Sequence, residues 1–164
     1  MVKGKPVSES QTEMAVRMMP QQANPAGNIH GGEILRYIDL AAATAAMRHA
    51  RSSVVTASID RMDFRKPAHV GELVTFKASL NSVGHTSMEV GVRVEAENLY
   101  TGEKRHTASA YLTFIAMDDG KPTQVPHLVL ENPTQIRRNE EAKLRRQMRK
   151  GERERENISQ AGVG

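Results

Sequence analysis

The stretch Gly31–Ala50, which reads GGEILRYIDLAAATAAMRHA, decides the fold. It predicts a helix, because it contains no proline and almost no β-branched residue, and apolar side chains lie on nearly every side. Such a helix is expected to be enclosed by other structure. One carboxylate, that of Asp39, stands in the middle of the apolar run. Since an unpaired buried charge is costly, we expect Asp39 to have a polar partner or a chemical role.

The predicted helix begins with Gly31 and Gly32, which leave the first-turn backbone N–H groups uncovered by side chains. A carbonyl oxygen or an anion could approach these groups, so the helix start is a candidate oxyanion hole. Asp39 stands about two turns, or roughly 10 Å, further along the helix axis. One carbonyl group cannot easily touch both within one chain. The simplest joint geometry is a two-fold dimer whose antiparallel helices bring the helix start of one copy to Asp39 of the other.

Composition limits the class of protein. The 164 residues allow one domain with a proper core, and no apolar run is long enough to cross a bilayer. The first ten residues, MVKGKPVSES, lack the apolar stretch of a signal peptide, and the absence of cysteine excludes disulfides and thiolate chemistry. We therefore expect a cytoplasmic protein. The net charge of +4 arises in residues 132–164, which hold nine Lys+Arg and five Asp+Glu, because residues 1–131 hold fourteen of each.

After the helix, the pattern changes to strict alternation of apolar and polar residues, which predicts half-buried strands. The predicted strands after the helix are 54–62, 74–81, 88–97 and 105–117, and residues 12–19 form a further predicted strand before it. Short turns between them favour an antiparallel sheet with one dry face, and only one long helix is available to cover that face. We expect an α+β fold in which a sheet of five to six strands wraps round the central helix, the hot-dog architecture. Such sheets commonly pair edge to edge, which removes exposed edges.

The expected organisation has three parts. Residues 1–9 form a flexible N-terminus, residues 10–120 form the hot-dog domain, and residues 121–164 form a proline-containing linker followed by a charged helix and tail. The last residues, 159–164, are expected to be disordered.

The charged helix is predicted at residues 134–157 and has few apolar positions, chiefly Ile136, Leu144 and Met148, so we expect it to be lightly docked. The favoured interpretation is a solvated helix of mixed charge. A contact between subunits, or a cationic arm near phosphates, are alternatives. Interspersed Glu residues and the lack of aromatics argue against nucleic-acid binding.

The block Asn24–Asp39, followed by residues 55–60 and Phe64, resembles the hot-dog acyl-CoA thioesterases. It is most similar to the bacterial short-chain acyl-CoA hydrolases and the two-domain brain-type acyl-CoA hydrolases, over about residues 10–118. The resemblance implies hydrolysis of acyl-CoA to fatty acid and coenzyme A. It implies no metal and no cofactor beyond the coenzyme A of the substrate. It also implies a hexameric homo-oligomer, a trimer of hot-dog dimers, in which the loop Asn of one subunit faces the helix Asp of another.

The same resemblance implies roles for individual residues. Asp39 would act as general base towards water, or alternatively as a nucleophile. Asn24 would orient the water or the thioester oxygen, and the N–H of Gly31 or Gly32 would stabilise the oxyanion. His30 would line the pocket.

The coenzyme A site is less clear. Family members often carry an Arg-Ser pair after the glycine that ends the third strand, whereas this chain reads Gly84-His85-Thr86-Ser87. His85 cannot supply the planar fork of an arginine, although Thr86 and Ser87 keep hydroxyl donors. We take His85, Thr86 and Ser87 as candidate coenzyme A contacts, and the nearest alternative cations are Arg61, Arg65 and Lys66.

Simpler interpretations stand beside these. A lone Asp39 can be structural, two glycines before a helix can just form a turn, and Asn24 can cap its loop. Two other functions fit the same fold. A dehydratase or hydratase would use His30 as acid/base partner of Asp39, and an acyl-CoA-binding regulator would bind without turnover.

Overall fold

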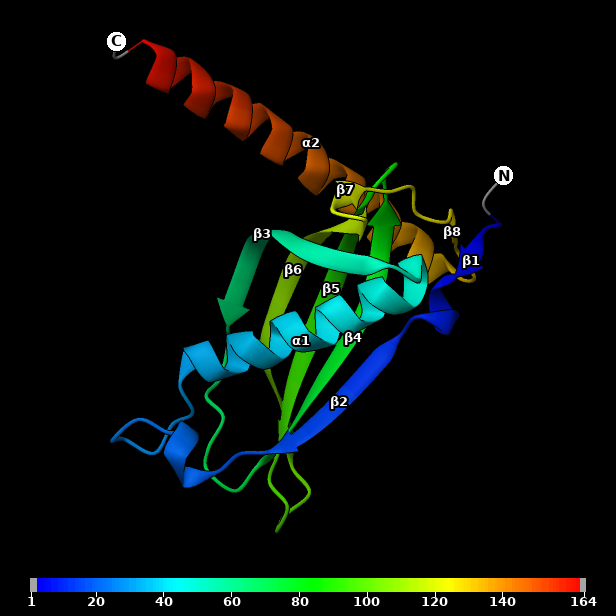
Figure 1. Ribbon diagram of the computed structural model, residues 1–164. Coiled ribbons are helices and arrows are strands. Elements are labelled where there is room, and N and C mark those ends of the chain that lie inside the picture. The colour runs from blue at the N-terminus through cyan, green and yellow to red at the C-terminus, as the bar shows by residue number, and fades with distance from the viewer. Residues whose placement is uncertain (1–2, 163–164) are drawn as a thin grey trace.

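The computed structural model describes residues 3–162. In chain order its elements are β1 (Lys5–Pro6), a 3-10 helix η1 (Val7–Glu9), β2 (Thr12–Arg17), a 3-10 helix η2 (Pro20–Gln22), α1 (Gly31–Ala50), β3 (Ser53–Phe64), β4 (Leu73–Val83), β5 (Ser87–Glu97), β6 (Lys104–Asp118), β7 (Lys121–Pro122), β8 (Leu128–Val129) and α2 (Pro133–Ala161). The principal sheet has the strand order β2-β4-β5-β6-β3, with β7 paired to β6, and every pairing in it is antiparallel. It curves round α1, so the predicted hot-dog arrangement is confirmed (Figure 1).

The inner face of the sheet forms the core with α1. Cross-strand partners place the predicted apolar sets in register, with Phe76 opposite Val94 and Val90 opposite Leu112. The buried members of these sets are Val74, Phe76, Ala78 and Leu80 of β4, Met88, Val90, Val92, Val94 and Ala96 of β5, and Ala108, Ala110, Leu112, Phe114 and Ala116 of β6. Several positions of α1 that face them are alanines, whose small side chains let the helix lie close to the sheet.

One side of α1 remains open in the single chain. Leu40 and Met47 are 46% and 49% exposed, so the expectation that the helix is enclosed on all sides is wrong for one copy of the chain. The adjoining edge strand β3 also presents apolar side chains to solvent, with Val55 at 49%, Ile59 at 42% and Phe64 at 55% exposure. The open side of α1 and this edge are therefore apolar surfaces that the single chain leaves uncovered.

Strand β3 is irregular where it pairs with β6. Its register shifts between Thr56 and Ser58 and again between Ile59 and Arg61, as β-bulges do. Each shift leaves one residue of β3 without a direct partner on β6.

The N-terminal segment differs from the flexible arm that its polar composition predicts. Residues Lys5–Pro6 pair in parallel with β8, and Val7 is fully buried. The Lys5 ammonium donates hydrogen bonds to the carbonyl oxygens of Arg48 and His49, where a positive charge complements the C-terminal end of the α1 dipole. These hydrogen bonds join Lys5 to the C-terminal end of α1, and burial of Val7 packs the start of η1 against the rest of the fold. Residues 1 and 2 lie outside the described residues.

Helix α2 crosses the outer face of the sheet and continues beyond it (Figure 1). It begins at Pro133 after the N-cap Asn132, whose side chain accepts a hydrogen bond from the Gln135 N–H at 3.0 Å. Its three predicted apolar contacts are exposed, with Ile136 at 46%, Leu144 at 59% and Met148 at 66%. The residues that α2 buries are Gln135, Asn139 and Ala142.

The helix is held by polar groups instead. Asn139 donates a 2.9 Å hydrogen bond to the Asn81 carbonyl, and Arg145 and Arg149 contact carboxylates on the sheet. The few apolar side chains of α2 contribute little burial, as expected, but the helix gains polar contacts at Asn139, Arg145 and Arg149 that the sequence did not predict. The helix also extends to Ala161, beyond the predicted end at 157, while residues 163 and 164 lie outside the described part. In residues 3–162, neither helix combines the length and apolarity needed to cross a membrane.

Candidate active site

Asp39 lies at the centre of α1 and is partly buried rather than enclosed. Its Oδ1 accepts a hydrogen bond of 2.9 Å from the Thr56 hydroxyl of β3. The Thr56 side chain is exposed, so this pair is accessible from solvent in the single chain. The expectation of a carboxylate surrounded by apolar groups is therefore corrected. The sequence analysis left open whether Asp39 has a polar partner or a chemical role, and within one chain the Thr56 hydroxyl is such a partner. Thr56 belongs to the block 55–60 but was not singled out.

The start of α1 leaves its amides free. The His30 carbonyl accepts hydrogen bonds from the N–H groups of Glu33 at 3.0 Å and Ile34 at 3.2 Å. The amides of Gly31 and Gly32 donate to no group among the described residues. Both glycines are exposed, so their N–H groups can reach a ligand oxygen, as an oxyanion hole requires.

The Asn24 side chain caps its own loop. Its side-chain oxygen accepts hydrogen bonds from the N–H groups of Ala26 at 3.0 Å and Asn28 at 3.2 Å, which is the loop-capping arrangement. The side-chain NH₂ of Asn24 has no hydrogen-bond partner within residues 3–162 and remains able to donate. No hydrogen bond in the described chain joins Asn24 to Asp39, so one copy of the chain does not bring the two together.

A cavity of about 370 Å³ lies beside the helix start, and its lining includes Gly31, Phe64, Arg65, Lys66 and Thr107. A Cβ atom on Gly31 would lie 3.1 Å from the Phe64 ring, so this glycine permits the close approach of the ring. The cavity places Arg65 and Lys66 near the candidate oxyanion hole. Thr107 also lines the cavity, while its hydroxyl oxygen is buried and has no hydrogen-bond partner in the described chain.

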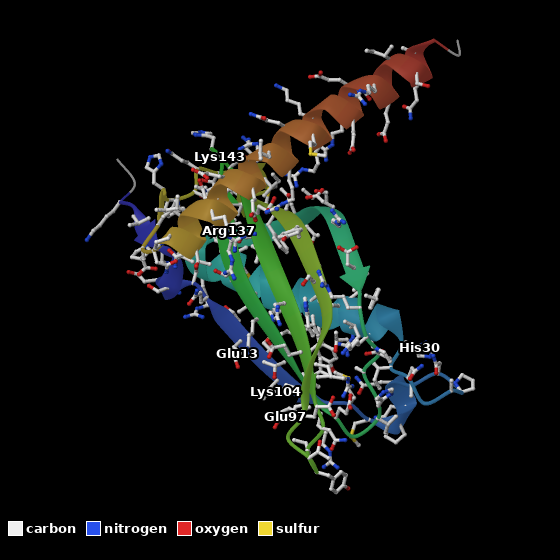
Figure 2. The ribbon with its side chains drawn as sticks, turned by 180° about the vertical axis from the view of Figure 1, so that it is seen from behind. Glu13, His30, Glu97, Lys104, Arg137 and Lys143 are labelled. Atoms are coloured by element: carbon white, nitrogen blue, oxygen red, sulfur yellow. The ribbon has the colours of Figure 1, made fainter. Side chains whose placement is uncertain are left out.

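Two predicted binding residues lie elsewhere. Arg61 pairs with Asp63 at 3.0 Å on the surface and does not line this cavity. His30 is exposed at the N-cap of α1 and lies at the opposite end of the molecule from Arg137 and Lys143 of α2 (Figure 2). The side chain of His30 forms no capping hydrogen bond, and the start of α1 is not covered by α2.

The predicted coenzyme A turn lines a different cavity, of about 410 Å³, beneath α2 on the outer face of the sheet. Thr86 and Ser87 line it, whereas His85 is exposed and does not. The same cavity is lined by four basic residues of α2, Arg146, Arg149, Lys150 and Arg153. Sequence analysis named none of these four residues, although it weighed a cationic arm near phosphates for this helix, and their spacing of three and four places them on one face of it.

Comparison with known proteins defines the class. The Thioesterase superfamily model matches residues 26–103. The chain is 40% identical over 129 residues to the uncharacterized acyl-CoA thioester hydrolase YkhA of Bacillus subtilis, covering 78% of this chain and 75% of that protein. It therefore belongs to the Thioesterase superfamily and, within it, to the hot-dog acyl-CoA thioesterases.

Solved structures agree with this class. An apo-hexameric acyl-CoA thioesterase superposes with a TM-score of 0.89 at 41% identity, covering 92% of this chain and 97% of that one. The acyl-CoA hydrolase of Staphylococcus aureus, solved with butyryl coenzyme A and coenzyme A, superposes with a TM-score of 0.87 at 35% identity, covering 94% and 95%. Variants of that hydrolase replace one Asn, one Asp and one Thr by alanine, at positions separated by 15 and 17 residues. Asn24, Asp39 and Thr56 have the same separations in this chain.

Proposed function

We propose that this protein hydrolyses acyl-CoA thioesters to a free fatty acid and coenzyme A, with Asp39 as general base. The observation that carries the proposal is the accessible hydrogen bond of 2.9 Å between Asp39 and Thr56. It is supported by the matching separations of Asn, Asp and Thr in the S. aureus acyl-CoA hydrolase. Water and the chain's own residues supply every group that the reaction needs, so we propose no cofactor.

In the proposed mechanism, Thr56 fixes one oxygen of the Asp39 carboxylate, and the other oxygen accepts a proton from water. The water oxygen attacks the thioester carbonyl while the amide of Gly31 or Gly32 donates to the developing oxyanion. The NH₂ group of Asn24 orients the water or the thioester oxygen. When the carbon–sulfur bond breaks, Asp39 returns its proton to the departing thiolate, and the products are the acid and the free thiol.

We propose that two copies of the chain build each site, because the helix start and Asp39 of one copy cannot both reach one carbonyl group. The apolar edge strand β3, with Val55, Ile59 and Phe64 exposed, supports pairing of two sheets at this edge. We further propose a trimer of such dimers, in line with the hexameric thioesterase that the chain resembles. The cytoplasmic location stays a prediction.

Release of free thiol from acyl-CoAs of several chain lengths tests the proposal. Asp39→Asn should lower kcat by about 10²–10⁴-fold, because it removes the general base. Its far-UV circular dichroism and its elution volume in size-exclusion chromatography should stay unchanged. Asp118→Asn, which alters an exposed carboxylate at the end of β6 rather than on the β3 edge, is the matched control and should keep full activity.

The alternatives predict different outcomes in the same assay. A dehydratase or hydratase would change the acyl chain without releasing thiol, and a regulator would bind acyl-CoA without turnover. Full activity of Asp39→Asn would refute the proposed mechanism.

A further inference from the structure

The β4–β5 turn has a guanidinium beside it, although its own sequence lacks arginine. An added Cβ on Gly84 would lie only 2.6 Å from Nη1 and 2.9 Å from Nη2 of Arg146, so the Arg146 side chain of α2 packs directly against this glycine. The hydroxyl oxygen of Ser87 lies 2.6 Å from the same point. The turn therefore combines its own hydroxyl groups with a planar cationic fork supplied by a distant helix.

The cavity beneath α2 has a positive balance of charge. Its lining carries four cationic side chains, from Arg146, Arg149, Lys150 and Arg153, against the two carboxylates of Glu89 and Glu154. Arg149 is already engaged by the carboxylates of Asp60 and Glu89. Arg146, Lys150 and Arg153 form no ion pair with any residue in the described range.

The same cavity offers hydroxyl donors between the cations. Thr86 and Ser87 line it with hydroxyl groups, and Ser58, which also lines it, donates its hydroxyl to Asp60 at 3.1 Å. Guanidinium, ammonium and hydroxyl groups that converge on one cavity are the donor set that binds phosphate oxygens.

The cavity adjoins the candidate active site through strand β3. Thr56 contacts Asp39 on the inner side of this strand, whereas Ala57 and Ser58, the next two residues, line the outer cavity. A substrate whose phosphates occupy the cavity would therefore lie beside the strand that carries the Asp39 partner.

We infer that the cavity between α2 and the β4–β5 turn binds the phosphates of the nucleotide half of the acyl-CoA substrate, with Arg146 supplying the guanidinium that the turn lacks. The inference rests on the proposed function. On this inference, the basic C-terminal helix α2 forms part of the substrate site, although it lies outside the hot-dog domain.

Steady-state kinetics with two substrates test this inference. The substrates are butyryl-CoA and butyryl-pantetheine, and the second of them lacks the nucleotide and its phosphates. Arg146→Ala should raise KM for butyryl-CoA about tenfold, because one charge-assisted contact is lost, while kcat stays unchanged. Arg146→Lys should keep part of the affinity because the charge remains without the fork. Neither variant should alter the kinetics with butyryl-pantetheine. Arg155→Ala, which removes a charge from α2 outside the cavity, is the matched control and should behave as the unaltered protein.

A second substitution, in the β4–β5 turn itself, tests the same contact between Gly84 and Arg146. Gly84→Ala should displace the flexible end of the Arg146 side chain and raise KM for butyryl-CoA in the same way. An unchanged KM in both Arg146→Ala and Gly84→Ala would overturn the inference. An equal rise in KM for butyryl-pantetheine would also overturn it, because it would show that α2 acts only on the shape of the active site.

Calorimetric titration with adenosine 3′,5′-bisphosphate separates this inference from the proposed function. The unaltered protein should bind this nucleotide about tenfold more tightly than Arg146→Ala does, whether or not thioester hydrolysis is observed. Absence of hydrolysis would refute the proposed function alone, and equal binding by the two proteins would refute the phosphate site.

Discussion

Replacing Arg145 by alanine should loosen α2 from the sheet, because the buried carboxylate of Glu89 holds this helix through Arg145. The Arg145 Nη2 atom lies 2.7 Å from Glu89 Oε1, and the two side chains are only 21% and 3% exposed. The Arg145 guanidinium also lies 3.8 Å from the centre of the Tyr111 ring, a cation–π contact. The substitution removes both interactions and leaves the Glu89 charge buried.

The expected cost follows from what remains around Glu89. Breaking a buried ion pair by removing one partner typically costs about 3–5 kcal/mol. Glu89 keeps a hydrogen bond from the Asn81 side chain at 3.2 Å and an ion pair with Arg149 at 3.6 Å, so we expect the lower end of the range, about 3 kcal/mol. For a chain of this length, that corresponds to a drop in Tm of about 6–12 °C. Adding Glu89→Gln to Arg145→Ala should recover part of the loss, because the unpaired charge disappears.

Urea and thermal unfolding at one fixed protein concentration measure this effect, since assembly makes Tm depend on concentration. The matched control is Arg137→Ala, which breaks an exposed pair with Glu141 on the same helix, whose side chains are 62% and 42% exposed. That change should cost about 0.5 kcal/mol or less. If Arg145→Ala destabilises no more than Arg137→Ala, or if hydrogen exchange of the α2 amides is unaltered, the polar docking of α2 is refuted.

Further predictions concern the two ends of α1. Burial lowers the pKa of His49 below its ordinary value of 6.5, so the unfolded chain binds the proton more readily than the folded chain. The midpoint of urea unfolding should be highest above about pH 6.5 and should fall as the pH drops below this value. His49→Gln should weaken this pH dependence of the midpoint. Equal slopes in the two proteins would contradict this. Gly32→Ala meets open space and should raise the free energy of unfolding by about 0.4–1 kcal/mol, because alanine restricts the unfolded chain more than glycine does. Gly31→Ala should gain less, because its Cβ would lie 3.1 Å from the Phe64 ring, which must move. A larger gain in stability for Gly31→Ala than for Gly32→Ala would refute this reasoning.

The inner face of the fold could be predicted because its signal is local. Alternation along each strand identifies residues such as Phe76 and Val90, and the bounds of α1 follow from its composition. The exposure of Leu40 and Met47 could not be predicted, because an apolar side chain looks the same in sequence whether the chain itself or another surface covers it.

The outer face could not be predicted because its contacts join distant polar residues. Apolar patterning says nothing of a helix held by Arg145 and Glu89, which stand 56 residues apart. For the same reason, the sequence showed that the turn after Gly84 lacks an arginine but not that Arg146 lies beside it. Asp39 was predicted as a site residue from its unusual place in an apolar helix, whereas Thr56 has an ordinary place in a strand and carries no such signal.

The two bulges of β3 determine where this chain can change in length. Deletion of a residue next to Ala57 would reverse the face of the sheet to which the neighbouring side chains of β3 point. It would turn either Thr56 away from Asp39 or Ser58 away from the cavity beneath α2. The hairpin at Thr101–Gly102, which has no comparable register to keep, can gain or lose residues at little cost. Insertions and deletions among relatives should therefore gather at this hairpin and avoid β3.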